Sequence, residues 1–114
     1  YKRGEDYRKM KNSSKAIADY TKVISLQSSN FDRYIAMSYY WRGWLRLYVE
    51  KQYADAVEDF SCFLNMVNGR AGWDVNDQMV NAKNALIDRG YAYEQLGRSE
   101  EANEDYDRAF RLGS

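Results

Sequence analysis

The sequence predicts an all-α protein built from three helix-turn-helix hairpins. Residues 16–26, 56–66 and 102–112 share one pattern: Ala, Asp three positions later, an aromatic residue after the Asp, and apolar residues three and four positions beyond it. The chain has no Pro, which would remove a helix hydrogen bond and clash with the preceding turn. This internal similarity indicates a repeat array. Each segment also follows an Arg-Gly pair at a nearly constant distance: Arg3-Gly4, Arg42-Gly43 and Arg89-Gly90.

Six helices are expected, and the first three occupy the amino-terminal part of the chain. The first covers about residues 2–11. The second begins at Ser13 or Ser14, because either side chain can accept a hydrogen bond from a backbone N–H group as an N-cap. It ends near Leu26, and the third helix is expected over residues 31–50.

The other three helices follow a short turn. The fourth is expected over residues 53–67, and the glycine-containing segment 68–74 has the composition of a loop. The fifth covers residues 76–96 and ends at Gly97, which tolerates a positive φ. Ser99 caps the sixth helix, and the two Glu residues after it lie where the helix dipole favours negative charge.

The length of 114 residues suits a single domain, residues 1–114, with units of about 1–29, 30–68 and 76–114. No apolar run approaches the ~20 residues that cross a bilayer, and no signal-peptide pattern is visible. We therefore expect no membrane span and a cytoplasmic location. Because the sequence begins at Tyr1 and not at Met, we also expect it to be a fragment of a longer chain.

Residues with catalytic or metal-binding chemistry are scarce. The absence of His excludes His-based acid–base catalysis, and the single Cys62 excludes an intramolecular disulfide and a multi-Cys zinc site. We expect Cys62 to be an inert structural thiol. The segment 69–72 lacks the Gly-Lys-Ser/Thr ending of a phosphate-binding loop, so it is interpreted as a connection. We expect no cofactor, no metal site and no enzymatic activity.

The charges are unevenly distributed, although the net charge is zero. Residues 1–51 contain 11 Lys and Arg against 5 Asp and Glu, a net charge of +6, whereas residues 52–114 contain 6 against 12, a net charge of −6. Opposite halves can attract each other within the repeat stack, attract an anionic partner, or stack chains head to tail. No basic stripe continues through the chain, so nucleic-acid binding is not expected.

The spacing of small and aromatic residues resembles that of tetratricopeptide repeat proteins. In the third unit the matching residues are Leu86, Gly90, Tyr93, Gly97, Ala102, Tyr106 and Ala109. In the first they are Gly4, Tyr7, Ala16, Tyr20 and Val23, and in the second Tyr53, Ala56, Phe60 and Phe63. The resemblance implies an α-α superhelix in which the first helix of each hairpin lines a concave groove that accepts peptides or helices.

The repeat spacing departs from that of the family. A unit usually has about 34 residues, yet Ala16 and Ala56 are 40 positions apart, and Ala56 and Ala102 are 46 apart. We expect the extra residues to lengthen the third and fifth helices by one to two turns at their amino ends. The superhelical pitch should change as a result.

Aromatic and apolar residues cover most of the circumference of the third helix, which indicates burial on several sides. By position in the family pattern, the groove-facing residues are Met37, Tyr40, Trp41, Trp44, Tyr48, Ile87, Tyr91 and Glu94. For each of them the alternative is packing against a neighbouring helix. Co-chaperone members of the family hold a terminal carboxylate with Lys and Asn, but the matching positions here hold Tyr1, Glu5, Tyr40, Trp44, Ile87 and Tyr91. An apolar or aromatic ligand segment is therefore expected.

The repeated charged residues predict three equivalent ion pairs. They would join Arg3, Arg42 and Arg89 to Asp19, Asp59 and Asp105. Each charged residue flanks a position expected at a helix-packing surface, so partial burial is expected. The pairs could form within a hairpin or between adjacent hairpins, and fully solvated pairs would contribute only about 0–1 kcal/mol each.

These expectations favour a protein–protein interaction scaffold that binds a peptide or helical segment in its groove. The alternative is a homo-oligomerisation module that stacks end to end through its oppositely charged halves.

Overall fold

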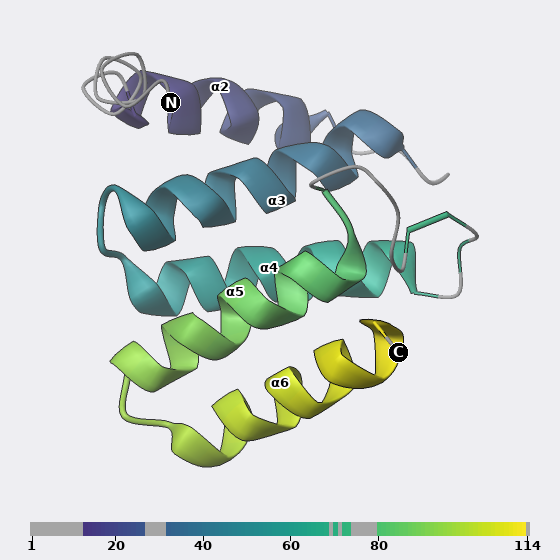
Figure 1. Ribbon diagram of the computed structural model, residues 1–114. Helices are drawn as coiled ribbons and strands as arrows, with labels where there is room; N and C mark the ends of the chain where they lie inside the picture. Colours follow the sequence, from purple (N-terminus) through teal and green to yellow (C-terminus); the bar gives the residue numbers. More distant parts are fainter. Residues whose placement is uncertain (1–12, 27–31, 69, 71, 74–79, 114) are drawn as a thin grey trace, which may run out of the picture.

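The computed structural model describes residues 13–26, 32–68, 70, 72–73 and 80–113. Within these residues the secondary structure consists of α-helices without strands, which confirms the all-α prediction. The helices, labelled as in Figure 1, are α2 (Ser13–Ser25), α3 (Arg33–Tyr48), α4 (Tyr53–Val67), α5 (Ala82–Gln95) and α6 (Ser99–Gly113). The helix predicted over residues 2–11 lies outside the described residues.

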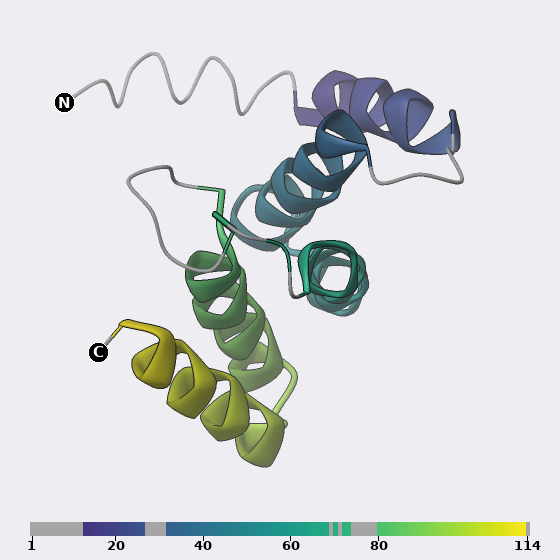
Figure 2. The ribbon, with the colours of Figure 1, turned by 90° about the vertical axis from the view of Figure 1, so that its right-hand side faces the viewer.

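The helices form a stack in chain order. From α2 to α6, helices that are consecutive in the chain pack against each other, and α3 also contacts α5 (Figure 1). In Figure 2, where α4 is seen close to end-on, α5 and α6 lie to one side of α4 and not in one plane with α3. This succession of turned helical hairpins is the predicted α-α superhelix.

Side-chain caps fix where α3 and α5 begin. Asp32 accepts hydrogen bonds from the backbone N–H groups of Tyr34 (2.8 Å) and Ile35 (3.2 Å), so α3 starts at Arg33 and not at residue 31. The side chain of Asn81 accepts from the N–H group of Asn84 (2.8 Å), so α5 starts at Ala82. Such caps satisfy backbone donors that have no partner inside the helix.

The expected lengthening of the helices is wrong for α5, which has 14 residues against 15 in α4. Between α4 and α5, the described residues 68, 70, 72–73 and 80–81 are not helical. Trp73 packs against the core: the residue is only 7% exposed, and its ring makes an edge contact with that of Phe63 at 5.8 Å between centroids. Its carbonyl also accepts a hydrogen bond from the N–H group of Ala82.

Small residues lie where the helices approach closely. Ala56 and Ala102 are buried, at 0% and 1% exposure, and Ala16 is partly buried. Gly43 lies against Phe60, and Gly90 lies against Tyr106. Larger side chains at these positions would prevent helix axes from approaching to about 8–10 Å. The largest buried side chains between α3 and α4 are Tyr40, Leu47, Phe60 and Phe63.

Candidate functional site: the surface between α3 and α5

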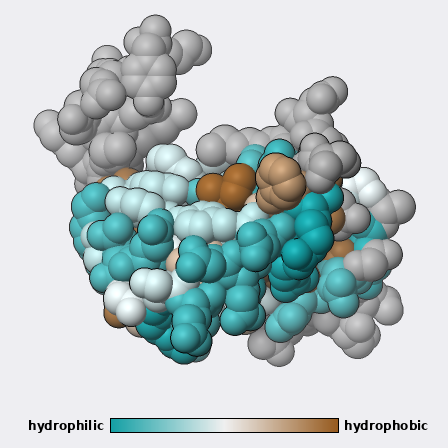
Figure 3. Space-filling view, turned by 60° about the horizontal axis from the view of Figure 1, so that its bottom comes forward, coloured by the Kyte–Doolittle hydropathy of each residue, from teal (hydrophilic) through white to brown (hydrophobic). Residues whose placement is uncertain are grey.

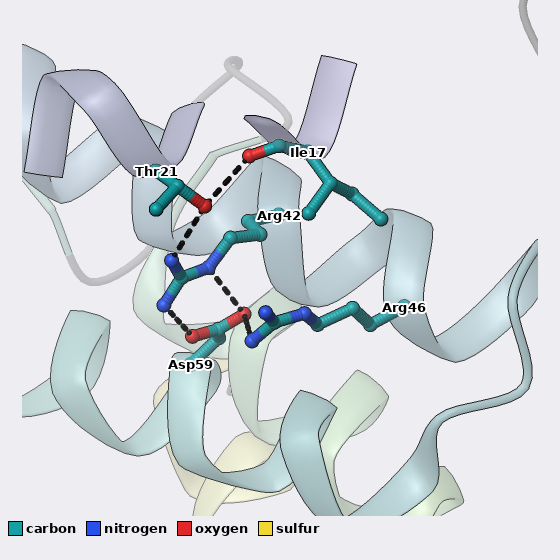
Figure 4. Close-up of polar contacts among 5 residues, drawn as sticks. All are labelled: Ile17, Thr21, Arg42, Arg46 and Asp59. Carbon is teal, nitrogen blue, oxygen red and sulfur yellow. Dashed lines mark hydrogen bonds and ion pairs between the residues drawn. The ribbon is translucent and has the colours of Figure 1, made fainter. Parts of the chain in front are cut away.

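A buried ion pair joins α3 to α4. The Arg42 guanidinium donates from Nη2 to Asp59 Oδ1 (2.6 Å) and from Nε to Oδ2 (3.0 Å), and Arg46 Nη1 donates to the same Oδ2 (3.1 Å) (Figure 4). The Asp59 side chain is 2% exposed. Sequence reasoning missed Arg46, although it lies one helical turn after Arg42, on the same face.

The same bidentate arrangement joins α5 to α6. Arg89 donates from Nη2 to Asp105 Oδ1 (2.7 Å) and from Nε to Oδ2 (2.8 Å). Both ion pairs therefore form within a hairpin. In addition, Arg42 Nη1 donates to the Thr21 hydroxyl on α2, and Arg89 Nη1 donates to the Ser61 hydroxyl on α4, each at 3.0 Å.

The third predicted pair joins Arg3 to Asp19. Arg3 lies outside the described residues, and Asp19 is exposed on α2. This pair stays a prediction.

Aromatic side chains run in a row from α3 onto α5. The ring of Trp44 lies 6.1 Å from that of Trp41 and 5.2 Å from that of Tyr48, measured between centroids. Tyr48 stacks on Tyr91 of α5 at 5.7 Å, with 17° between the ring planes. The row joins the first helices of two successive hairpins.

A pocket of about 310 Å³ opens beside this aromatic row. It is lined by Tyr40, Trp44 and Tyr48 of α3 and by Asn84, Ile87 and Asp88 of α5. The sequence analysis did not identify Asn84 or Asp88. Nothing in the pattern of a single helix distinguishes Asp88 from an ordinary surface carboxylate beside Arg89.

Asp88 is the charged residue of the pocket. Its carboxylate accepts hydrogen bonds from the hydroxyl groups of Tyr48 (2.6 Å) and Tyr40 (3.2 Å), and the residue is only 9% exposed. Burial raises the pKa of the Asp88 carboxyl above its usual value, whereas the two tyrosine hydrogen bonds oppose that shift. The pKa values of Tyr40 and Tyr48 are also raised, mainly by burial, so both hydroxyls stay protonated and donate.

The predicted groove residues differ in exposure. Ile87 (39%) and Tyr91 (37%) are exposed, and Glu94 is exposed and accepts a hydrogen bond from the Tyr106 hydroxyl. Trp44 and Tyr48 are partly buried and line the pocket. Met37 and Trp41 are partly buried and pack against the core.

Tyr40 needs a correction. It is 0% exposed, with its ring in edge contact with those of Phe60 and Phe63. It therefore supports the pocket from beneath and offers no surface to a partner.

The family model for the tetratricopeptide repeat matches residues 1–30 and 84–112, which together are more than half of the chain. The chain is a tetratricopeptide repeat protein. A comparison with curated proteins finds no match. Tetratricopeptide repeats are generally protein–protein interaction modules and typically non-enzymatic scaffolds.

The sequence predicts neither a membrane span nor a metal site in the described part of this tetratricopeptide repeat protein. None of the helices there is long and apolar enough to cross a membrane. No cluster of His, Cys, Asp and Glu side chains in the same part of the chain could hold a metal ion.

Proposed function

We propose that this tetratricopeptide repeat protein binds a segment of a partner protein in the groove between α3 and α5. The observation that supports this most is the continuous aromatic row from Trp44 through Tyr48 to Tyr91, beside the pocket between the two helices. These residues come from the first helices of successive hairpins, the position at which the family forms its binding groove.

Binding would depend on burial of the exposed apolar side chains. Apolar area removed from water contributes about 25 cal/mol per Å², and aromatic residues in well-packed pockets dominate binding energies at interfaces. The rings here are held in place before a partner arrives, because Tyr48 stacks on Tyr91 and donates a hydrogen bond to Asp88. Less ordering entropy is then lost on association.

Panning of a displayed random-peptide library on the full chain tests the proposal. Selected peptides should shift NMR resonances of α3 and α5 more than those of α4 and α6. Their affinity should fall at least tenfold, about 1.4 kcal/mol, in the double variant Ile87→Ala, Tyr91→Ala.

Tyr34→Ala is the matched control, since Tyr34 is 75% exposed on α3 and does not line the pocket. Equal loss of affinity in the double variant and in this control, with both variants folded, would contradict groove binding.

Self-association is the second candidate, and two strongly exposed apolar residues favour it. Phe110 of α6 and Leu26, directly after α2, are each 76% exposed. However, the face shown in Figure 3, with the α6 side turned forward, is mostly hydrophilic. The carboxy-terminal half is also not uniformly acidic, because Arg89, Arg108 and Arg111 line a hollow of about 550 Å³ there. Light scattering that shows a mass rising with concentration and falling with added salt would support end-to-end stacking.

A further inference from the structure

The pocket between α3 and α5 contains a carboxylate without a cationic partner. Among the described residues, Asp88 is the only charged one that lines the pocket, and no described Lys or Arg forms an ion pair with it. Asp59 and Asp105, which are also buried, differ because each faces at least one Arg. Of these three buried carboxylates, Asp88 is the one without a countercharge in the described part of the chain.

The two tyrosine hydroxyls only partly satisfy this carboxylate. An ionised carboxyl group has two oxygens with about four acceptor sites, and each Asp88 oxygen accepts one of the described hydrogen bonds, Oδ1 from Tyr48 and Oδ2 from Tyr40. A buried anion remains costly unless it is paired and hydrogen-bonded. A cation that enters the pocket would offset this cost, whereas an apolar group would increase it by removing the remaining water.

The rest of the lining also suits a cation. Trp44 and Tyr48 present aromatic rings, and the quadrupole of such a ring attracts a nearby cation. Asn84 adds a neutral amide, so it brings no cationic charge that would repel such a ligand. The volume of about 310 Å³ is at the lower end of the ~300–1,000 Å³ typical of ligand pockets. It therefore suits a single side chain better than a whole cofactor.

We propose that this pocket takes the cationic side chain of a Lys or Arg residue in the bound segment, with Asp88 as the countercharge and Trp44 and Tyr48 as aromatic walls. This inference rests on the groove binding proposed above. The segment would thus place one basic residue in the pocket and apolar residues on Ile87 and Tyr91. An apolar side chain in the pocket is the competing outcome.

Two small probes of similar size test the pocket on the unaltered full chain. Titration with n-butylammonium should shift the indole N–H resonance of Trp44, assigned with Trp44→Phe, in a saturable manner. The neutral probe n-butanol should bind at least fivefold more weakly. Equal responses to both probes would overturn the inference, and this comparison needs no variant that removes the carboxylate.

A charge-removing variant sharpens the test. Asp88→Asn keeps an acceptor oxygen for one of the two tyrosine hydroxyls. It removes the charge, so it should abolish the preference for n-butylammonium. Asp55→Asn, on an exposed residue of α4, should leave the preference unchanged. Preference retained in a folded Asp88→Asn variant would overturn the role of Asp88.

Selected peptides separate this inference from the proposed function. Replacement of their Lys by norleucine should weaken binding at least tenfold in the unaltered chain and have little effect in Asp88→Asn. Equal affinity of Lys and norleucine peptides would overturn this inference and leave groove binding intact. Failure to recover any groove-binding peptide would overturn the proposed function, and the inference with it.

Discussion

The α3–α4 hairpin and the α5–α6 hairpin have the same framework. In each, an Arg on the first helix makes a bidentate contact with an Asp on the second, Arg42 with Asp59 and Arg89 with Asp105. The Gly after each Arg lies against the aromatic residue that follows the Asp. The repeated sequence pattern therefore corresponds to a repeated three-dimensional contact.

The two hairpins differ four residues after the Arg. In α3 this position is Arg46, which adds a second cation to Asp59. In α5 it is Tyr93, whose ring lies beneath the guanidinium groups of Arg89 (5.8 Å) and Arg98 (5.2 Å). In the α3–α4 hairpin two cations thus contact one buried carboxylate, whereas the α5–α6 hairpin has an aromatic ring at the position of the second cation. The same Arg–Asp contact therefore forms in unlike surroundings.

Removal of the Asp59 or Asp105 carboxylate should have the largest effect on stability, and the size of the effect should differ between the two hairpins. Loss of one partner of a buried pair costs about 3–5 kcal/mol because it leaves an uncompensated buried charge. Asp59→Ala leaves two guanidinium groups without their carboxylate, so we expect the free energy of unfolding to fall by about 4 kcal/mol. Asp105→Ala leaves one, so we expect a fall of about 3 kcal/mol. Urea unfolding followed by circular dichroism measures both, with the exposed Asp107→Ala as the control.

Equal losses in the two variants would remove the distinction between the hairpins. An unchanged melting temperature for Asp59→Ala would mean that the pair contributes no more than a solvated one.

Substitution of the two glycines should give intermediate effects of different sizes. A Cβ atom on Gly90 would lie 2.7 Å from Tyr106 Cε1, whereas one on Gly43 would lie 3.1 Å from Asp59 Cβ and 3.2 Å from Phe60. Overpacking costs about 1–3 kcal/mol, and replacing Gly by Ala in a helix returns about 1 kcal/mol. Gly90→Ala should lower the free energy of unfolding by about 1–2 kcal/mol, and Gly43→Ala should change it by less than about 1 kcal/mol. A larger loss for Gly43→Ala in thermal unfolding would show that the α3–α4 contact is the more rigid one.

The hydroxyl groups that join successive hairpins should give the smallest effects. A typical hydrogen bond contributes about 0.5–1.5 kcal/mol net. Ser61→Ala should lower the free energy of unfolding by about 1 kcal/mol, because the contact of Ser61 with Arg89 is partly buried. Thr21→Val should lower it by about 0.5 kcal/mol, because the contact of Thr21 with Arg42 is exposed. Chemical denaturation of both variants measures the difference. The reverse order would place the stronger link at the amino-terminal end of the stack.

The repeated pattern was sufficient to predict the all-α class, the hairpins and the residues at their close contacts. It could not predict that α5 begins only at Ala82, because the cap at Asn81 and the packing of Trp73 depend on the folded structure and not on the repeat pattern. The same reason explains the errors at the candidate site. Tyr40 and Trp44 both belong to the aromatic face of α3, and only the positions of α4 and α5 decide that Tyr40 is fully buried and Trp44 only partly buried. Asp88 is identified as a pocket residue only by the folded structure, in which two tyrosine hydroxyls of α3 donate hydrogen bonds to its carboxylate.

The double attachment of Arg42 and Arg89 has a consequence for how the protein unfolds. In repeat proteins, stability is approximately a sum of terms for each unit and for each interface with the next unit. Each of these arginines contributes to both terms at once, because the same guanidinium contacts its own hairpin and the preceding helix. The unfolding of one hairpin therefore also weakens its interface with the preceding helix. We expect the array to melt in one cooperative step and not unit by unit from its ends.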